Sequence, residues 1–197
     1  RALDLQPGRT VADVGAGSGY HVFLMSPVVG ETGKVIASDI QKEMLDLLQE
    51  RVATRGIKNI EPILATETNP GLQADSLDLV LMVDVYHELS KPEPILKEVH
   101  RSLKRNGVLV LVEFREEDPN VPIRPLHKMS QPQVLKELTA NGFKLTGQFD
   151  KLPWQHVLFF ATKQSSLPRQ KLVAWEPKRP DVPAMSSTPS RAAPHQE

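Results

Sequence analysis

The sequence predicts an α/β domain built on a doubly wound, mostly parallel β-sheet. Apolar strand-like runs alternate with amphipathic helical patterns along most of the chain, which is typical of repeated β-α-β units. The last two strand candidates have no helix between them, which predicts an antiparallel hairpin at the edge of the sheet. The strand candidates cover residues 11–15, 34–39, 60–65, 77–85, 107–114, 143–150 and 156–163.

The first strand leads directly into a glycine-rich turn. Residues 11–20 read V-A-D-V-G-A-G-S-G-Y, with glycines at 15, 17 and 19. Glycines at such a turn let backbone N–H groups approach a ligand, and a helix follows them. The second strand ends at Asp39, where a carboxylate can accept hydrogen bonds from ribose hydroxyls. Together the two strands indicate a cofactor that contains a nucleoside.

Three further helices are recognised by their apolar faces and by the residues at their ends. They are expected over residues 41–55, 92–105 and 131–141. Gly56 follows the first helix as a stop signal. Ser90 with Glu93, and Ser130 with Gln133, have the spacing of capping boxes before the second and third helices. The strand over 77–85 is a nearly continuous apolar run, as expected for burial on both faces of a parallel sheet.

The glycine spacing separates two classes of nucleoside cofactor. A dinucleotide fold favours G-x-G-x-x-G, but the position of its third glycine is Tyr20 in this chain. Asp13 places a carboxylate in a strand otherwise made of Val and Ala, which is costly without hydrogen-bond donors. An amine on the ligand would supply them. The sequence therefore favours a nucleoside with a positively charged amino-acid arm, and it disfavours a nucleotide-dependent oxidoreductase.

Residues 13–19, D-V-G-A-G-S-G, resemble motif I of the class I S-adenosylmethionine-dependent methyltransferases. The resemblance runs from about Gln6 to Lys163 and includes Asp39 and the closing hairpin. It implies a seven-stranded, Rossmann-like methyltransferase domain over residues 1–163, with S-adenosylmethionine as the cofactor. It also implies that the cofactor contacts Asp13, Gly15, Ala16, Gly17, Gly19, Asp39, Ile40, Glu67, Asp84 and Val85.

Several of these residues have a purely structural alternative. The glycines could only form a tight turn, and Asp39 could only cap the next helix. Glu67 could be a solvated loop residue, and Asp84 could cap a turn. His87 is the candidate general base, because an ordinary histidine exchanges protons near neutral pH. Its alternative is a histidine packed at the start of a loop. The connection that contains His127 is expected to form part of the acceptor wall.

Composition limits the remaining choices. Lys plus Arg and Asp plus Glu are both 24, and the zero net charge argues against nucleic acid and anionic membranes as partners. The chain has no cysteine, which excludes cysteine nucleophiles and thiolate metal sites, and we expect no metal site. No apolar stretch is long enough to span a bilayer. A small-molecule methyl acceptor, at an O, N or C atom, is therefore expected, with the oligomeric state left open.

Two alternatives share the cofactor. One is methylation of a macromolecule, protein or RNA, and the other is a cofactor-binding module without turnover. The second arises because the chain begins at Arg1, so that a helical cap before Pro7 is expected to be largely missing through processing or truncation. For the same reason the compartment stays open, with a cytoplasmic location favoured. Residues 164–197 are rich in proline and are expected to form a disordered tail.

Overall fold

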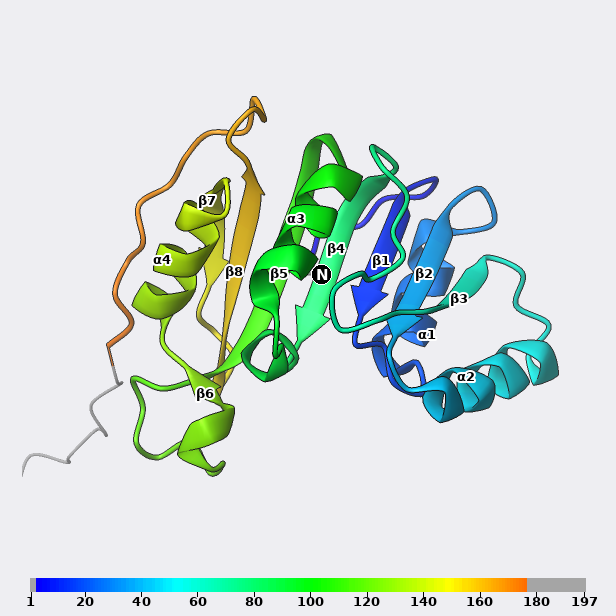
Figure 1. The fold of residues 1–197 in the computed structure, drawn as a ribbon, viewed down its shortest axis with the longest axis horizontal. Helices are drawn as coiled ribbons and strands as arrows, with labels where there is room; N and C mark the ends of the chain where they lie inside the picture. Colours follow the sequence, from blue (N-terminus) through cyan, green and yellow to red (C-terminus); the bar gives the residue numbers. More distant parts are fainter. Residues whose placement is uncertain (1–2, 177–197) are drawn as a thin grey trace, which may run out of the picture.

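The computed structural model describes residues 3–176 and has one mixed sheet with helices on both faces (Figure 1). Its strands lie in the order β3-β2-β1-β4-β5-β8-β7. Strands β1 to β5 are parallel, whereas β8 is antiparallel to both β5 and β7. This confirms the predicted doubly wound sheet and its closing hairpin. The bounds are β1 Thr10–Val14, β2 Lys34–Asp39, β3 Ile60–Leu64, β4 Leu77–Val83, β5 Leu103–Arg115, β7 Phe143–Phe149 and β8 Gln155–Thr162.

The helices cover the two faces because neighbouring residues of each strand point in opposite directions. Val11 and Val35 pack with residues of α1 and α2, whereas Ala12 and Ile36 belong to the core under α3 and α4. Figure 1 views the sheet from the side of α3 and α4. None of the helices in residues 3–176 is both long and apolar enough to cross a membrane. The bounds are α1 Tyr20–Val29, α2 Lys42–Thr54, α3 Pro92–Ser102 and α4 Gln131–Ala140.

The predicted N-cap residue is confirmed for α4, whereas both predicted ends of α3 differ from the structure. Ser130 is the N-cap of α4 and its side chain accepts a hydrogen bond from the backbone N–H of Gln133, which is one half of the predicted capping box, whereas the Gln133 side chain donates to Glu137. The predicted capping box at Ser90 is wrong, because α3 begins after Lys91 and has no side-chain cap. The predicted end of α3 at residue 105 is also wrong. Its backbone leaves the helix at Leu103, which pairs with Leu77 as the first residue of β5.

A short strand that the sequence does not predict holds the connection after β5 against the sheet. This strand, β6, is Lys128–Met129, and it pairs in parallel with Phe114 and Arg115 at the end of β5. It directly follows a 3-10 turn, Pro125–His127. The connection from residue 116 therefore returns to the carboxyl end of β5, where ligands bind in open α/β sheets.

Residues 164–176 differ from the expected disordered tail. They contain no helix or strand, but they run along the domain and make specific contacts. Ser165 is buried and its hydroxyl donates to Asn106 Oδ1, and the backbone N–H of Gln170 donates to the carbonyl of Leu145. The rest of the expected tail, residues 177–197, lies outside the described residues.

Candidate functional site

A cavity of about 500 Å³ lies at the carboxyl ends of β1, β2 and β4. This is the edge at which the fold class places its ligands, and the volume is typical of small-molecule sites. Six of the predicted cofactor residues line it, namely Gly15, Gly17, Asp39, Ile40, Glu67 and Val85. Its wall continues along the segment after β4 to Glu88, Leu89 and Ser90.

The glycine turn forms the floor of the cavity. Gly15 and Gly17 have φ values of +78° and +52°, a left-handed conformation that disfavours any residue with a side chain. A Cβ on Gly15 would lie 2.9 Å from Val85 Cγ1, whereas a Cβ on Gly17 would meet no atom within 4 Å. Gly15 is therefore required for packing against Val85, while Gly17 exposes its backbone to the cavity.

Asp39 fixes the glycine turn from the neighbouring strand. Its Oδ2 accepts a hydrogen bond of 2.7 Å from the backbone N–H of Gly17, and its Oδ1 accepts one of 2.8 Å from the N–H of Gln41. Gln41 itself is the N-cap of α2, so Asp39 supports the start of this helix without being its cap residue. The carboxylate thus lines the cavity and joins the ends of β1 and β2.

Four predicted cofactor residues do not line the cavity. Asp13 is buried in β1, and its Oδ2 has no hydrogen-bond partner among the described residues. Burial and the nearby charge of Asp39 raise the pKa of Asp13 to about 7. Ala16 and Gly19 are buried in the turn, where Gly19 is the N-cap of α1. Asp84 ends β4 with a left-handed φ of +54°, and its Oδ2 accepts a hydrogen bond from Gln155.

Glu67 and Ile40 stand at the rim. The Glu67 side chain is 63% exposed, and its carboxylate lies 3.5 Å from the ammonium group of Lys91. Ile40 is 59% exposed, which leaves its side chain available to cover a ligand. Both residues border the cavity, so the prediction that they contact the cofactor is compatible with their positions.

His87, the candidate general base, is held by a buried carboxylate. Its Nδ1 lies 2.6 Å from Glu113 Oε2, and the other oxygen of Glu113 accepts from the backbone N–H of Tyr86. Burial raises the pKa of Glu113 above its ordinary value, and the contact with His87 and the N–H of Tyr86 offset this rise only in part. An ionised Glu113 accepts from Nδ1–H, and the other ring nitrogen, Nε2, then keeps its lone pair.

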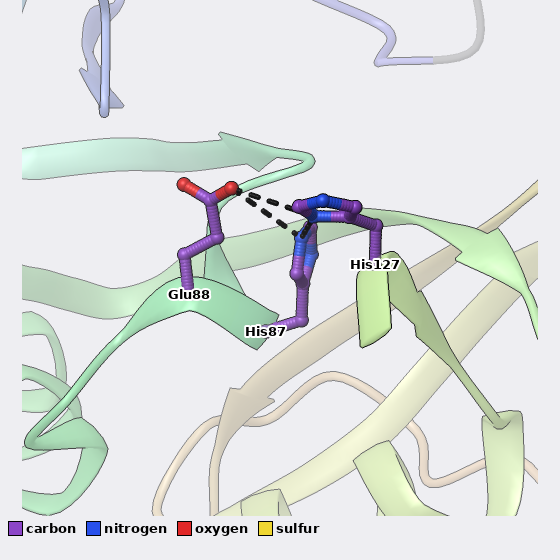
Figure 2. A group of neighbouring side chains, drawn as sticks. All are labelled: His87, Glu88 and His127. Carbon is purple, nitrogen blue, oxygen red and sulfur yellow. Dashed lines mark hydrogen bonds and ion pairs between the residues drawn. The ribbon is translucent and has the colours of Figure 1, made fainter. Parts of the chain in front are cut away.

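The other side of His87 faces two residues that the sequence does not identify as partners. Nε2 of His87 lies 3.2 Å from Nδ1 of His127 and 3.7 Å from Oε1 of Glu88. Figure 2 shows the Glu88 carboxylate and the His127 ring directed at this nitrogen from different elements. His127 is 40 positions away in sequence and is placed here by the connection that β6 anchors.

The residues of the cavity fit S-adenosylmethionine. Gly17 leaves open space for a close approach, and Asp39 presents a carboxylate at the cavity wall. Asp13 does not line the cavity, but it directly precedes Val14, which does, and its Oδ2 has no hydrogen-bond partner among the described residues, so an ammonium group of a ligand near it would be favourable. Bound there, the cofactor would contact Gly15, Gly17, Asp39 and Val85.

The fold and cavity define a class of α/β proteins that bind a nucleoside cofactor at the carboxyl edge of the sheet. Comparison with known families shows to which family of this class the chain belongs. A family described as "Methyltransferase domain" matches residues 5–164. The chain therefore belongs to the class I S-adenosylmethionine-dependent methyltransferase family, as predicted.

Individual relatives agree with this assignment. The chain is similar to the crystal structure of an S-adenosylmethionine-dependent methyltransferase from Aquifex aeolicus, with a TM-score of 0.75 and 30% identity, over 81% of this chain and 85% of that one. It is 26% identical over 150 residues to the uncharacterized methyltransferase YcgJ of Bacillus subtilis. It is 32% identical over 108 residues to the ubiquinone/menaquinone biosynthesis C-methyltransferase UbiE of Escherichia fergusonii.

The two curated relatives are longer than the part that matches. The similarity to YcgJ covers 75% of this chain and 58% of that protein, and the similarity to UbiE covers 54% and 43%. The chain thus spans about half the length of these relatives.

Proposed function

We propose that the chain binds S-adenosylmethionine in the cavity and that its methyl group is transferred to a small-molecule acceptor. The observation that carries this proposal is one continuous wall, from Gly17 and Asp39 to Val85 and Glu88, that joins the cofactor residues to the vicinity of His87. When bound, the cofactor supplies a methyl group that its sulfonium already activates. The protein then has to align this methyl group with the acceptor. Such alignment can lower the activation barrier by about 7–11 kcal/mol in well-oriented systems.

The chain's own residues divide this work. Asp39 holds the N–H of Gly17 and thereby the shape of the floor, and its carboxylate is the acceptor for ribose hydroxyls. Val85 packs against Gly15 and sets the depth of the cavity between β1 and the segment after β4. His87, oriented by Glu113, is the group that would accept a proton from an acceptor that has one to lose.

Three observations support a small acceptor. UbiE, which shares this core, is a C-methyltransferase of ubiquinone and menaquinone biosynthesis. The net charge of zero offers no general attraction for nucleic acid. Beyond the cofactor residues the wall of the 500 Å³ cavity continues only along Glu88, Leu89 and Ser90, at and after the short 3-10 turn Tyr86–Glu88, and to Ile95.

Calorimetric titration with S-adenosylmethionine tests the cofactor assignment. We expect Asp39→Ala to weaken binding at least about tenfold, because a charge-assisted hydrogen bond contributes about 1.5–3 kcal/mol. Asp46→Ala is the matched control, since within residues 3–176 Asp46 pairs only with Lys42, on the exposed side of α2. Circular dichroism of both variants checks that they are folded. Equal affinity of the two variants, or no binding by the wild type, would overturn the proposal.

A labelled-methyl experiment tests the acceptor class. Cell extract separated into small-molecule, protein and RNA fractions is incubated with the protein and labelled cofactor. We expect label in the small-molecule fraction alone. Label in protein or RNA would replace this acceptor class by a macromolecule, and binding without any transfer would support a cofactor-binding module without turnover.

A further inference from the structure

Three ligand-type atoms from two segments converge beside the proposed acceptor site. They are His87 Nε2, His127 Nδ1 and Glu88 Oε1. Their separations are 3.2 Å between the two nitrogens, 3.7 Å from the His87 nitrogen to the oxygen, and 3.6 Å from the His127 nitrogen to the oxygen. Figure 2 shows the three side chains directed at one another.

The size of this triangle matches a small divalent cation. The point equidistant from its corners lies about 2 Å from each, and bonds of Zn²⁺ to histidine nitrogen or carboxylate oxygen measure about 2.0–2.2 Å. The triangle therefore needs little side-chain movement to hold such an ion. Two imidazoles and one carboxylate are also a frequent donor set of catalytic zinc sites, which keep a coordination position open.

The surroundings of His87 have the features of a supported metal ligand. Its Nδ1 lies 2.6 Å from the buried Glu113, which fixes the ring and directs the Nε2 lone pair toward His127 and Glu88. A carboxylate behind a ligating histidine is the usual outer partner in metal sites. The carboxylates of Glu88 and Glu113 together bring the charge that offsets a divalent cation.

The triangle can also be reached from outside. The side chain of His87 is only 7% exposed, whereas those of His127 and Glu88 are 33% and 61% exposed. One side of the triangle is thus closed by the fold and the other is open to solvent. Glu88 also lines the cofactor cavity, so an ion here would lie at the border of that cavity.

We propose that His87, Glu88 and His127 bind one divalent transition-metal cation, represented by Zn²⁺. Imidazole ligands favour zinc and its first-row neighbours, whereas Mg²⁺ prefers oxygen ligands. His87 can serve as the proton acceptor of the proposed function only when no metal is bound, because a nitrogen bound to a metal has no lone pair left for a proton. The site does not depend on the proposed methyl transfer.

Calorimetric titration of the untagged, chelator-treated protein with Zn²⁺, without cofactor or acceptor, tests the site. We expect one saturable Zn²⁺ site per chain and no comparable binding of Mg²⁺. His127→Ala and Glu88→Gln each remove a ligand and should weaken Zn²⁺ binding by at least about tenfold. His100→Ala is the matched control, because His100 lies on α3 and packs against Phe143. Its affinity should equal that of the wild type.

Two further measurements separate a metal site from a simple hydrogen-bonded histidine pair. Co²⁺ in place of Zn²⁺ should give visible absorption bands that His127→Ala abolishes and His100→Ala retains. Glu113→Gln leaves all three ligands in place and should weaken Zn²⁺ binding by about 10–100-fold through the orientation of His87. Absence of saturable Zn²⁺ binding, or equal affinity of the His127→Ala and His100→Ala variants, would overturn the proposal. Since Glu88 is exposed, Glu88→Gln keeps the test valid even if His127→Ala fails to fold.

Discussion

The contact between Gly15 and Val85 gives a sharp test of how the glycine turn is built. Gly15→Ala would place a Cβ 2.9 Å from Val85 Cγ1 and 3.2 Å from Val85 Cβ, with Cγ2 nearer still. Rotation of the valine side chain moves its methyl groups but leaves its Cβ in place. The two backbone segments must therefore separate or the valine must leave its site.

The expected loss in the free energy of unfolding has two parts. A left-handed conformation costs a residue with a Cβ about 1–2 kcal/mol, and overpacking costs about 1–3 kcal/mol. Gly15→Ala should therefore lower the free energy of unfolding by about 2–5 kcal/mol. Gly17→Ala has the same left-handed backbone but open space around its Cβ, so that only the first part, about 1–2 kcal/mol, applies.

Urea unfolding of four proteins measures the two parts separately: Gly15→Ala, Gly17→Ala, Val85→Ala and the double variant at positions 15 and 85. We expect the double variant to be more stable than the sum of its single changes predicts, by about 1 kcal/mol or more, because shortening Val85 removes its two methyl contacts and leaves only the Cβ at 3.2 Å. Equal destabilisation by the two glycine substitutions, together with additive behaviour of the pair, would refute the explanation.

Two other predictions concern buried charges. Burial and Asp39 raise the folded-state pKa of Asp13 from 3.8 to about 7. Between about pH 4 and 7 the folded protein therefore keeps a proton that the unfolded chain releases. The free energy of unfolding falls as the pH rises through this range. Asp13→Asn stays neutral and should flatten this fall and stabilise the protein above pH 7, by up to a few kcal/mol, whereas parallel unfolding profiles at pH 5 and pH 8 would contradict it. Asp150→Ala leaves the fully buried Arg115 without its 3.0 Å partner and should cost about 3 kcal/mol in thermal or urea unfolding. Asp46→Ala breaks an exposed ion pair and should cost less than about 1 kcal/mol, so similar losses in the two variants would show that burial is not the cause.

The strands were the most predictable part of the fold, because strands buried on both faces appear as continuous apolar runs. β4 lies within the predicted 77–85 and stops at Val83, since Asp84 takes a left-handed φ that ends the strand. The end of α3 was less predictable. Leu103 continues the apolar stripe of that helix in sequence, but its backbone pairs with Leu77 in the neighbouring strand. The periodicity of the sequence does not reveal whether such a residue belongs to the helix or to the strand.

The glycine turn and Asp39 of the cavity could be predicted from the sequence because they are close in sequence and have distinctive residue types. Gly17 and Asp39 meet through the pairing of two neighbouring strands, as their spacing implies. The pair of His87 and Glu113 depends instead on the register of β4 against β5, where Val83 lies beside Val112. His127 depends on β6, whose two residues are too few to produce a recognisable strand pattern.

The anchoring of the connection after β5 has a consequence for how this protein can change. The connection begins at Arg115, which is part of β5, and its end returns to the same strand through β6. Both ends of the connection are therefore fixed to the sheet. Pro122 and Arg124, near its middle, are exposed. Lengthening or shortening the connection there would change the segment that leads to His127 without displacing β5 or the floor of the cavity. The length of this connection can therefore vary while the sheet and the floor of the cavity stay unchanged.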